Sequence, residues 1–342
     1  MRFAVLGSYG RSNIGDEAIA DGIAKMLREV DPTCELVLFT HDTQAVAAQH
    51  TSYQIHHPMI ASGLRSFWRQ WRDGTWSKSI ELLRSSHWVI IGGGGIFHDH
   101  EVGQKGLNPL FIWWLRTVLL KLLKKPILIW SVGMGPIQNQ SSSFWLKGIL
   151  KRAHTITVRD QASVDLVKQY THKEITVVPD PVWGSLPAPS QSQVEGTLGI
   201  NIRESHRYSL EQLEKLLHET IDQVMQTQPI KQILLIPFAF HQPDDREIMK
   251  SLRTKLKIHY SLPIEISTAQ TIESVYAIVA SCSFMIAMRF HSYIFAQSAQ
   301  VPSSLMSYSS KTDEITKSTV QEYESQQQDT VVFWQDILSR TL

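Results

Sequence analysis

Residues 283–297 read SFMIAMRFHSYIFAQ, and the fold of the chain can be worked out from this stretch. It opens with an apolar run typical of a buried strand and continues with residues that can form a helix. Arg289 and His291 therefore lie where a strand passes into a helix. In open α/β sheets, ligands bind outside the carboxyl ends of the strands. The junction is thus a candidate site, although a lone Arg-x-His more often marks a helix start with an exposed arginine.

The same alternation of strand and helix recurs along the whole chain and predicts doubly wound parallel sheets. Strands are expected at 3–6, 35–40, 54–57, 87–91, 127–132, 155–158, 175–178, 197–202, 232–236, 264–266, 284–287 and 304–306. Helical patterns include 18–30, 64–72, 108–125, 144–152, 210–225, 244–256 and 272–280.

The chain of 342 residues is long enough for two domains. Its clearest linker is the polar, proline-rich stretch 186–193. We expect an N-terminal Rossmann-like domain over 1–185 on the acceptor side and a C-terminal Rossmann-like domain over 194–320 on the donor side. A C-terminal helix over 321–342 is expected to pack back on the first domain. Two such domains facing across a cleft make a GT-B-like architecture of the α/β class.

The composition argues against several classes of protein. A formal net charge of +1 creates no field that would attract nucleic acid. The two cysteines, Cys34 and Cys282, form no motif and indicate free thiols in a reducing compartment. No uninterrupted apolar run reaches the roughly 20 residues of a membrane span. We therefore expect a soluble, cytoplasmic protein.

The loop after the first predicted strand, residues 7–17, reads GSYGRSNIGDE. It matches neither the Walker pattern nor Gly-x-Gly-x-x-Gly. Asp16 and Glu17 suit the dipole of the helix that follows but would repel a phosphate there. A tight turn and a capped helix explain these acids, but they do not explain Tyr9 and Arg11 in the turn.

A second glycine-rich loop, Gly92 to Gly95, follows the strand at 87–91. Glycines at a strand end let the backbone approach a ligand or another loop closely. The sequence His98-Asp99-His100 comes next, but His-x-His without a third placed ligand is a weak metal signal. We therefore interpret this stretch as loop structure and expect no metal.

Two predicted helices combine tryptophan with basic residues. In 64–72 the arginines share one face, and Phe67, Trp68 and Trp71 share another. In 108–125, Trp113 and Trp114 lie near the start and basic residues near the end. Such helices can contact an anionic membrane surface or a glycan. The alternatives are a core-facing helix for the first and packing between the domains for the second.

Five stretches, in this order, resemble the polysaccharide pyruvyl transferase family, most closely its branch that modifies bacterial cell-wall polymers. They are residues 7–18, 92–99, 132–137 and 158–160, and the Met288-Arg289-Phe290-His291-Ser292 stretch running on to Val301-Pro302. The family's Arg-x-His matches Arg289 and His291, its Val-Arg-Asp arginine matches Arg159, and a downstream lysine matches Lys311. The chain departs from the cell-wall branch at Arg11, where an aromatic residue is common.

The resemblance implies a GT-B-like transferase that moves pyruvate from phosphoenolpyruvate to a sugar diol as a ketal and releases phosphate. The acceptor would be a cell-surface polysaccharide or exopolysaccharide, or its lipid-linked precursor, and no cofactor is implied. Phosphoenolpyruvate carries two anionic groups, so we expect cations to converge on it. The residues expected to bind this donor are Arg159, Arg203, Arg289 and Lys311.

Ketal formation also needs an acid to protonate the enol carbon and a base to deprotonate the sugar hydroxyls. His291 is the expected acid, with Arg289 beside it, while Asp16, Glu17 and Asp99 are alternatives for the base. The acceptor side and its loops are expected to include Tyr9, Arg11, Asn13, Asp16, Glu17, Gly93, Gly94 and Asp99.

Two other functions fit parts of the sequence. A GT-B glycosyltransferase using a nucleotide-sugar shares the expected fold, but no clear acidic residue is placed for a ribose diol near 288–302. A glycan- or membrane-binding module without catalysis would use the Trp/Arg helices. As a hypothesis, Trp68, Trp71, Trp113 and Trp114 help dock an enzyme at the inner membrane face.

Overall fold

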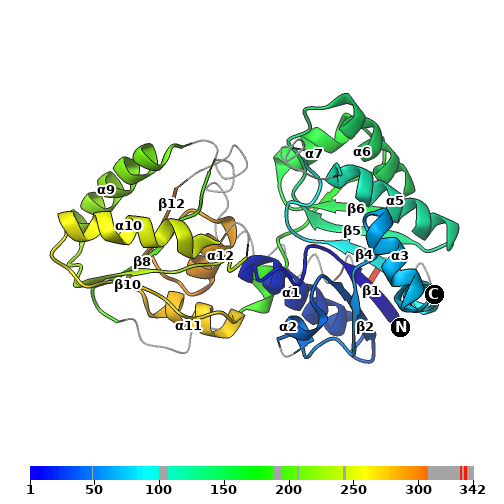
Figure 1. Ribbon diagram of the computed structural model, residues 1–342, viewed down its shortest axis with the longest axis horizontal. Coiled ribbons are helices and arrows are strands. Elements are labelled where there is room, and N and C mark those ends of the chain that lie inside the picture. Colours follow the sequence, from blue (N-terminus) through cyan, green and yellow to red (C-terminus); the bar gives the residue numbers. More distant parts are fainter. Residues whose placement is uncertain are drawn as a thin grey trace. The chain divides into compact units, whose positions relative to one another are not determined.

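The computed structural model describes residues 1–47, 49–99, 107–187, 194–205, 208–241 and 244–306, together with Val332, Gln335 and Asp336. The chain divides into two compact units (Figure 1). The first contains Met1–Gly10, Ala18–Ser185 and Tyr323–Leu342, and the second contains Arg11–Glu17 and Leu186–Glu322. The expected domains differ from this division, because the sequence assigned Arg11–Glu17 to the first. Apart from Val332, Gln335 and Asp336, the helix expected over 321–342 lies outside the described residues, and so does most of the expected linker.

The first unit is built on a seven-stranded parallel sheet with the order β3-β2-β1-β4-β5-β6-β7. Its strands are β1 (Arg2–Leu6), β2 (Glu35–Thr40), β3 (Ile55–Pro58), β4 (Trp88–Gly92), β5 (Ile127–Val132), β6 (Thr155–Val158) and β7 (Thr176–Val177). Its helices are α1 (Ile14–Val30), α2 (Thr43–Ala47), α3 (Leu64–Arg72), α4 (Thr75–Ser85), α5 (Pro109–Leu122), α6 (Gln140–Arg152), α7 (Gln161–Lys168) and α8 (Val182–Ser185). The first four residues of α1 belong to the second unit.

The second unit has a five-stranded parallel sheet with the order β10-β9-β8-β11-β12. Its strands are β8 (Thr197–Asn201), β9 (Gln232–Leu235), β10 (Ile264–Ile266), β11 (Phe284–Ala287) and β12 (Ser303–Leu305). Its helices are α9 (Leu210–Thr227), α10 (Asp245–His259), α11 (Ile272–Ser281) and α12 (Phe290–Ser298). The expected α/β class with two doubly wound parallel sheets is confirmed.

Both sheets reverse their strand order in the middle, and this reversal is where doubly wound proteins bind ligands. In the first sheet the reversal lies between β1 and β4, and in the second it lies between β8 and β11. The central strands are buried along their whole length, which explains why their sequences read as apolar runs instead of alternating patterns. Function is therefore expected in the loops that follow β1, β4, β8 and β11.

Helix α1 begins at Ile14, four residues before the sequence pattern placed it. The side chain of Asn13 accepts a hydrogen bond from the N–H of Gly15 at 3.2 Å, and its carbonyl accepts one from Glu17 at 3.0 Å. Asn13 thus acts as the cap of the helix. The sequence pattern placed the start of the helix too late because Gly15 has a low helix propensity.

The two Trp-bearing helices behave differently from each other. Trp113 of α5 is buried at 6% exposure beneath the Arg116 guanidinium, and the ring of Trp114 packs against Trp145 of α6 at 4.8 Å. The burial of Trp113 contradicts its expected membrane-docking role, whereas Trp114 is half-buried and its role stays a prediction. In α3, by contrast, Trp68 and Trp71 are 59% and 58% exposed, so the core-facing alternative is wrong there.

Gly22 lets α1 pack directly on the chain that follows β7. A Cβ atom added at Gly22 would lie 2.2 Å from the backbone oxygen of Pro181. Alanine ordinarily stabilises a helix interior relative to glycine. We expect Gly22→Ala to do the opposite and lower the free energy of unfolding by about 1–3 kcal/mol, because the clash is with backbone. Urea unfolding would measure this loss.

Glu29→Ala on the exposed face of the same helix is the matched control, since it adds helix propensity without a clash. It should leave the unfolding midpoint almost unchanged. A Gly22→Ala variant as stable as the wild type would contradict the close packing of α1.

Candidate functional site

The strand-order reversal in the second sheet brings together the loops that follow β8 and β11. Asn201, the last residue of β8, is fully buried, and its side-chain oxygen accepts hydrogen bonds from the N–H of Arg289 and the hydroxyl of Ser292, both at 3.0 Å. The side-chain amide of Asn201 donates to the backbone oxygen of Ile236 at 2.9 Å. Asn201 therefore connects the turn from β11 into α12 with the end of β8 and with the chain just after β9.

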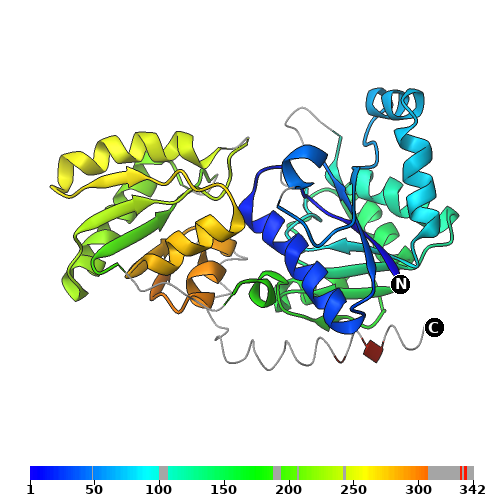
Figure 2. The ribbon, with the colours of Figure 1, turned by 90° about the horizontal axis from the view of Figure 1, so that it is seen from below.

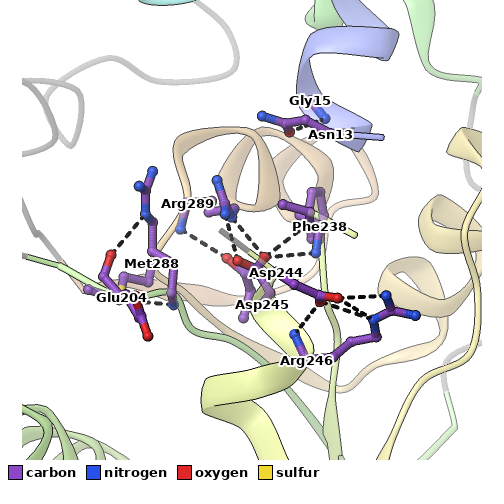
Figure 3. A network of polar contacts seen from close by, with 12 residues as sticks. Asn13, Gly15, Glu204, Phe238, Asp244, Asp245, Arg246, Met288 and Arg289 are labelled. Carbon is purple, nitrogen blue, oxygen red and sulfur yellow. Dashed lines mark hydrogen bonds and ion pairs between the residues drawn. The ribbon is translucent and has the colours of Figure 1, made fainter. Parts of the chain in front are cut away.

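Arg289 forms a buried ion pair with Asp245, the first residue of α10 (Figure 3). Its Nε and Nη2 atoms donate to the two carboxylate oxygens of Asp245 at 2.8 and 2.5 Å. The same carboxylate accepts the N–H groups of Phe238 and Ala239 at 3.0 and 3.1 Å. The sequence predicted that Arg289 binds the ligand directly. In the structure, its guanidinium is instead paired with the carboxylate of Asp245.

His291 is half-buried in the first turn of α12, and Gly15 lies directly against its ring. A Cβ atom at Gly15 would be 2.0 Å from Nδ1 of the imidazole. The Gly15 loop is held in the second unit by backbone hydrogen bonds, from Ile14 to the oxygen of Phe238 at 2.8 Å and from Phe240 to the oxygen of Ser12 at 3.0 Å. The sequence placed these two segments in separate domains, but both belong to one unit.

Two acidic residues follow Gly15 and differ in burial. Asp16 is half-buried, and its carboxylate accepts a hydrogen bond from the Asn13 side chain at 3.0 Å. Glu17 is only 2% exposed, and its carboxylate accepts the N–H of the exposed Arg11 at 3.3 Å. Glu17 is thus buried in its own loop, whereas Asp16 is partly exposed to solvent.

Arg203 follows β8 and is half-buried at the same sheet edge as Arg289. Its N–H donates to the sulfur of Met288 at 3.5 Å, and its Nε donates to the backbone oxygen of Glu204 at 3.1 Å (Figure 3). The contact with Met288 ties the loop after β8 to the loop after β11. Lys311, the remaining cation expected from this part of the chain, lies outside the described residues.

The glycine-rich loop after β4 is explained by packing within the first unit. Tyr9 is 1% exposed, and its hydroxyl donates to the backbone oxygen of Gly92 at 2.7 Å. Gly93 and Gly94 have φ angles of 68° and 69°, in the left-handed region that favours glycine. A Cβ atom at Gly93 would also lie 1.9 Å from the side chain of Ile19 in α1. Tyr9 is therefore a core residue and not a surface residue of the turn.

Arg159, expected to bind the donor, is held by carboxylates of its own unit. Its Nη1 lies 3.1 Å from Asp180 and its Nε lies 3.5 Å from Asp160, and the arginine side chain is 9% exposed. The guanidinium packs over Gly133, where a Cβ atom would be 2.7 Å from Nε. This arrangement orients the loops after β5 and β6, which is a structural role.

Asp99 is buried at 2% exposure and serves as an acceptor for the start of α6. Its carboxylate accepts the N–H groups of Gln138 and Asn139 at 2.9 and 2.8 Å, and the Asn139 side chain at 3.0 Å. Burial alone would raise the pKa of Asp99, but these hydrogen bonds outweigh it, so the pKa lies below its ordinary value. A residue so engaged is poorly suited to act as a base.

Sequence patterns did not identify Asp245 and Asn201 as site residues. Asn201 is the last residue of β8, and Asp245 is the first residue of α10, the helix that follows β9. A polar residue at that place is the available signal, because the strand ends of a parallel sheet share one edge. Sequence spacing could not show that both side chains meet Arg289.

The described part of the chain holds no group of three or more His, Cys, Asp or Glu side chains that could bind a metal ion. Among its helices, none is both long enough and apolar enough to cross a membrane.

Two Rossmann-like units, each with its own parallel sheet, define a GT-B-like fold, and solved structures support it. The UDP-GlcNAc 2-epimerase of Methanocaldococcus jannaschii aligns with a TM-score of 0.56 at 11% identity, over 93% of this chain and 91% of that one. HepE of Anabaena, solved with UDP and glucose, aligns with a TM-score of 0.52 at 10% identity, over 89% and 80%. An α-glucosyltransferase solved with UDP-glucose and DNA gives 0.52 at 9%, over 100% and 92%.

The protein is a transferase of known family. The polysaccharide pyruvyl transferase family model matches residues 13–310, and the chain therefore belongs to that family. The matched region runs from the Asn13 cap to beyond β12, so it includes His291, Arg289 and their partners. No curated protein matches the chain by sequence.

The hydrogen bonds of Asp99 predict a pH-dependent loss of stability. Because its pKa is lowered on folding, its contribution is present above the unfolded value of about 3.9 and is lost as the pH falls through the lower folded value. We expect Asp99→Asn to lower the free energy of unfolding by about 2 kcal/mol at pH 7. The difference from wild type should shrink when urea unfolding is repeated below about pH 4.

Asp165→Asn, at an exposed position of α7, is the control and should change little at either pH. Equal stability of Asp99→Asn and wild type at neutral pH would show that the carboxylate does not hold α6.

Proposed function

We propose that this protein transfers pyruvate from phosphoenolpyruvate to two hydroxyls of a sugar, forming a ketal and releasing phosphate. The acceptor would be a cell-surface polysaccharide or its lipid-linked precursor. Family membership supports the reaction class. The observation that carries the assignment of the site is the position of His291 and Arg203 at the strand-order reversal of the second sheet.

The donor would bind at the carboxyl ends of β8 and β11. Arg203 is the more accessible of the two described arginines there and suits a carboxylate or a phosphate. The N-terminus of α12 adds the positive end of a helix dipole, which favours an anion. Arg289, locked by Asp245, would set the position of this helix end and of His291.

The proposed reaction adds one sugar hydroxyl to phosphoenolpyruvate, expels phosphate and then adds the second hydroxyl. His291 donates a proton to the methylene carbon of phosphoenolpyruvate, which becomes a methyl group, while a sugar hydroxyl attacks the neighbouring carbon and loses its proton to a base. The C–O bond to phosphate then breaks, and the second hydroxyl attacks the same carbon. Of the two hydroxyl protons, one leaves with the phosphate and the other passes to the imidazole, so the base and His291 are both reset and the products are the ketal and inorganic phosphate.

Asp16 is the carboxylate we assign as the base in this scheme. It is half-buried beside Gly15, and Gly15 lies against the His291 ring. Glu17 and Asp99 are both 2% exposed and accept backbone hydrogen bonds, so they are less able to meet a sugar hydroxyl. Of the three carboxylates that the sequence left as alternatives for the base, Asp16 is therefore the one we propose.

Replacing His291 tests the assignment of the acid. We expect His291→Gln to lower turnover by about a hundred- to ten-thousand-fold, because the enol carbon loses its proton donor. Phosphate release from phosphoenolpyruvate in the presence of a glycan acceptor measures the rate. In heavy water the methyl group of the wild-type product should also carry deuterium, detected by mass.

His259→Gln, an exposed histidine at the end of α10, is the matched control and should keep wild-type activity. Near-normal turnover of folded His291→Gln would remove His291 from the mechanism. Thermal shift with phosphoenolpyruvate and with a panel of nucleotide-sugars tests the reaction class. Stabilisation by a nucleotide-sugar alone would favour a glycosyltransferase and overturn the proposal.

Gly15→Ala tests whether the loop of α1 positions the imidazole. A methyl group 2.0 Å from Nδ1 must displace either the ring or the loop. We expect turnover to fall by at least about tenfold, since small misplacements of reacting groups are costly. Helix content should be preserved, because alanine favours the helix.

Gly63→Ala is the control for Gly15→Ala, because an added Cβ there meets no atom within 4 Å. Circular dichroism and the phosphate-release assay, run on both variants, separate displacement of the ring from loss of folding. An active Gly15→Ala variant would contradict the role of this loop.

A further inference from the structure

Helix α3 turns Gln70 inward and leaves its arginines and most of its apolar residues exposed. The single buried residue of this helix is Gln70. Its side-chain amide donates to the backbone oxygen of Met59 at 2.8 Å, and its side-chain oxygen accepts the N–H of Ala61 at 3.1 Å. Both halves of the amide are thus hydrogen-bonded to the chain after β3. These bonds fix the rotation of the helix about its axis and leave Leu64, Trp68 and Trp71 outside.

The outward side of α3 carries two parallel stripes. Leu64, Trp68 and Trp71, at helical spacing, are 80%, 59% and 58% exposed. One position further along at each step stand Arg65, Arg69 and Arg72, which are also exposed. A shallow hollow is lined by these six side chains. We call the two stripes together the α3 face.

The aromatic residues of this region divide into an inner and an outer set. Phe67 packs edge-on against Trp76 of α4 at 4.9 Å, and this contact helps to join α3 to α4. Trp68 and Trp71 contact each other at 5.6 Å on the outside. Figure 2 shows α3 as a short blue helix at the edge of the first unit. The outer pair is therefore not needed to close the core.

We propose that the α3 face docks on an anionic lipid membrane. A stripe of tryptophan and leucine can enter the interface between headgroups and acyl chains, where indole rings are favoured. The arginines beside it would lie level with lipid phosphates, and α3 itself contains no acidic residue that would oppose them. The residue that follows the helix is Asp73, and its carboxylate is exposed.

A second copy of the chain fits the same face less well. In a two-fold symmetric contact the same patch meets itself. Three exposed arginines on each copy would then be brought together without the carboxylates needed to compensate them. The charge of the face instead complements a surface that is itself negative.

Co-sedimentation of the full chain with vesicles tests the proposal. We expect binding to vesicles of phosphatidylcholine mixed with phosphatidylglycerol, and much weaker binding to phosphatidylcholine alone. The double variant Trp68→Ser/Trp71→Ser should bind at least about tenfold more weakly, because the apolar stripe is lost. Arg69→Glu should weaken binding by more than about fivefold, the effect of losing one basic residue, and added salt should weaken binding further.

Matched controls use exposed residues on other helices. Phe144→Ser, at a side chain 63% exposed on α6, and Lys215→Glu, on α9, should bind like wild type. Absence of binding to anionic vesicles, or unchanged binding of the tryptophan variant, would overturn the proposal. Dimerisation that disappears in the tryptophan variant while vesicle binding is absent would assign the face to a second copy instead.

Discussion

The buried ion pair between Arg289 and Asp245 is the interaction on which the second unit's site depends. Each oxygen of the carboxylate meets the guanidinium, and the same group caps the backbone at Phe238 and Ala239. Removing one partner of such a pair leaves a buried charge, which typically costs about 3–5 kcal/mol. The pair therefore restricts the start of α12 to one arrangement. Asn201 adds a second constraint on the same turn, and His291 owes its position to both.

The two sheets use their strand-order reversals differently. At the first, between β1 and β4, Tyr9 and the glycines fill the space with tight packing between loop and helix. At the second, between β8 and β11, a half-buried arginine and a half-buried imidazole remain beside the rigid pair. The same strand order is thus filled by packing in the first unit, whereas in the second unit it carries an arginine and an imidazole. This contrast supports the proposal that the donor binds to the second unit.

Sequence patterns predicted the α/β class, all twelve strands of the described residues and the position of Arg289 and His291 at a strand end, because these follow from apolar periodicity within short windows. They did not predict the partner of Arg289. Asp245 lies 44 residues away in sequence, and the contact depends on how β8 and β9 align with β11. The rotation of α3 was equally hidden. Periodicity shows two stripes on that helix, but the hydrogen bonds of Gln70 decide which side faces inward.

Helix α1 begins in one unit and continues in the other, with Arg11–Glu17 belonging to the second. The second unit is therefore not a continuous piece of chain, and a fragment beginning at residue 186 would lack the strip that bonds to Phe238 and covers His291. A hybrid of two relatives joined at the 186–193 boundary would combine one parent's imidazole with the other parent's loop. Recombination at this boundary is thus constrained. The N-terminal loop and the Arg-x-His helix must come from the same parent, although most of the first unit lies between them in the sequence.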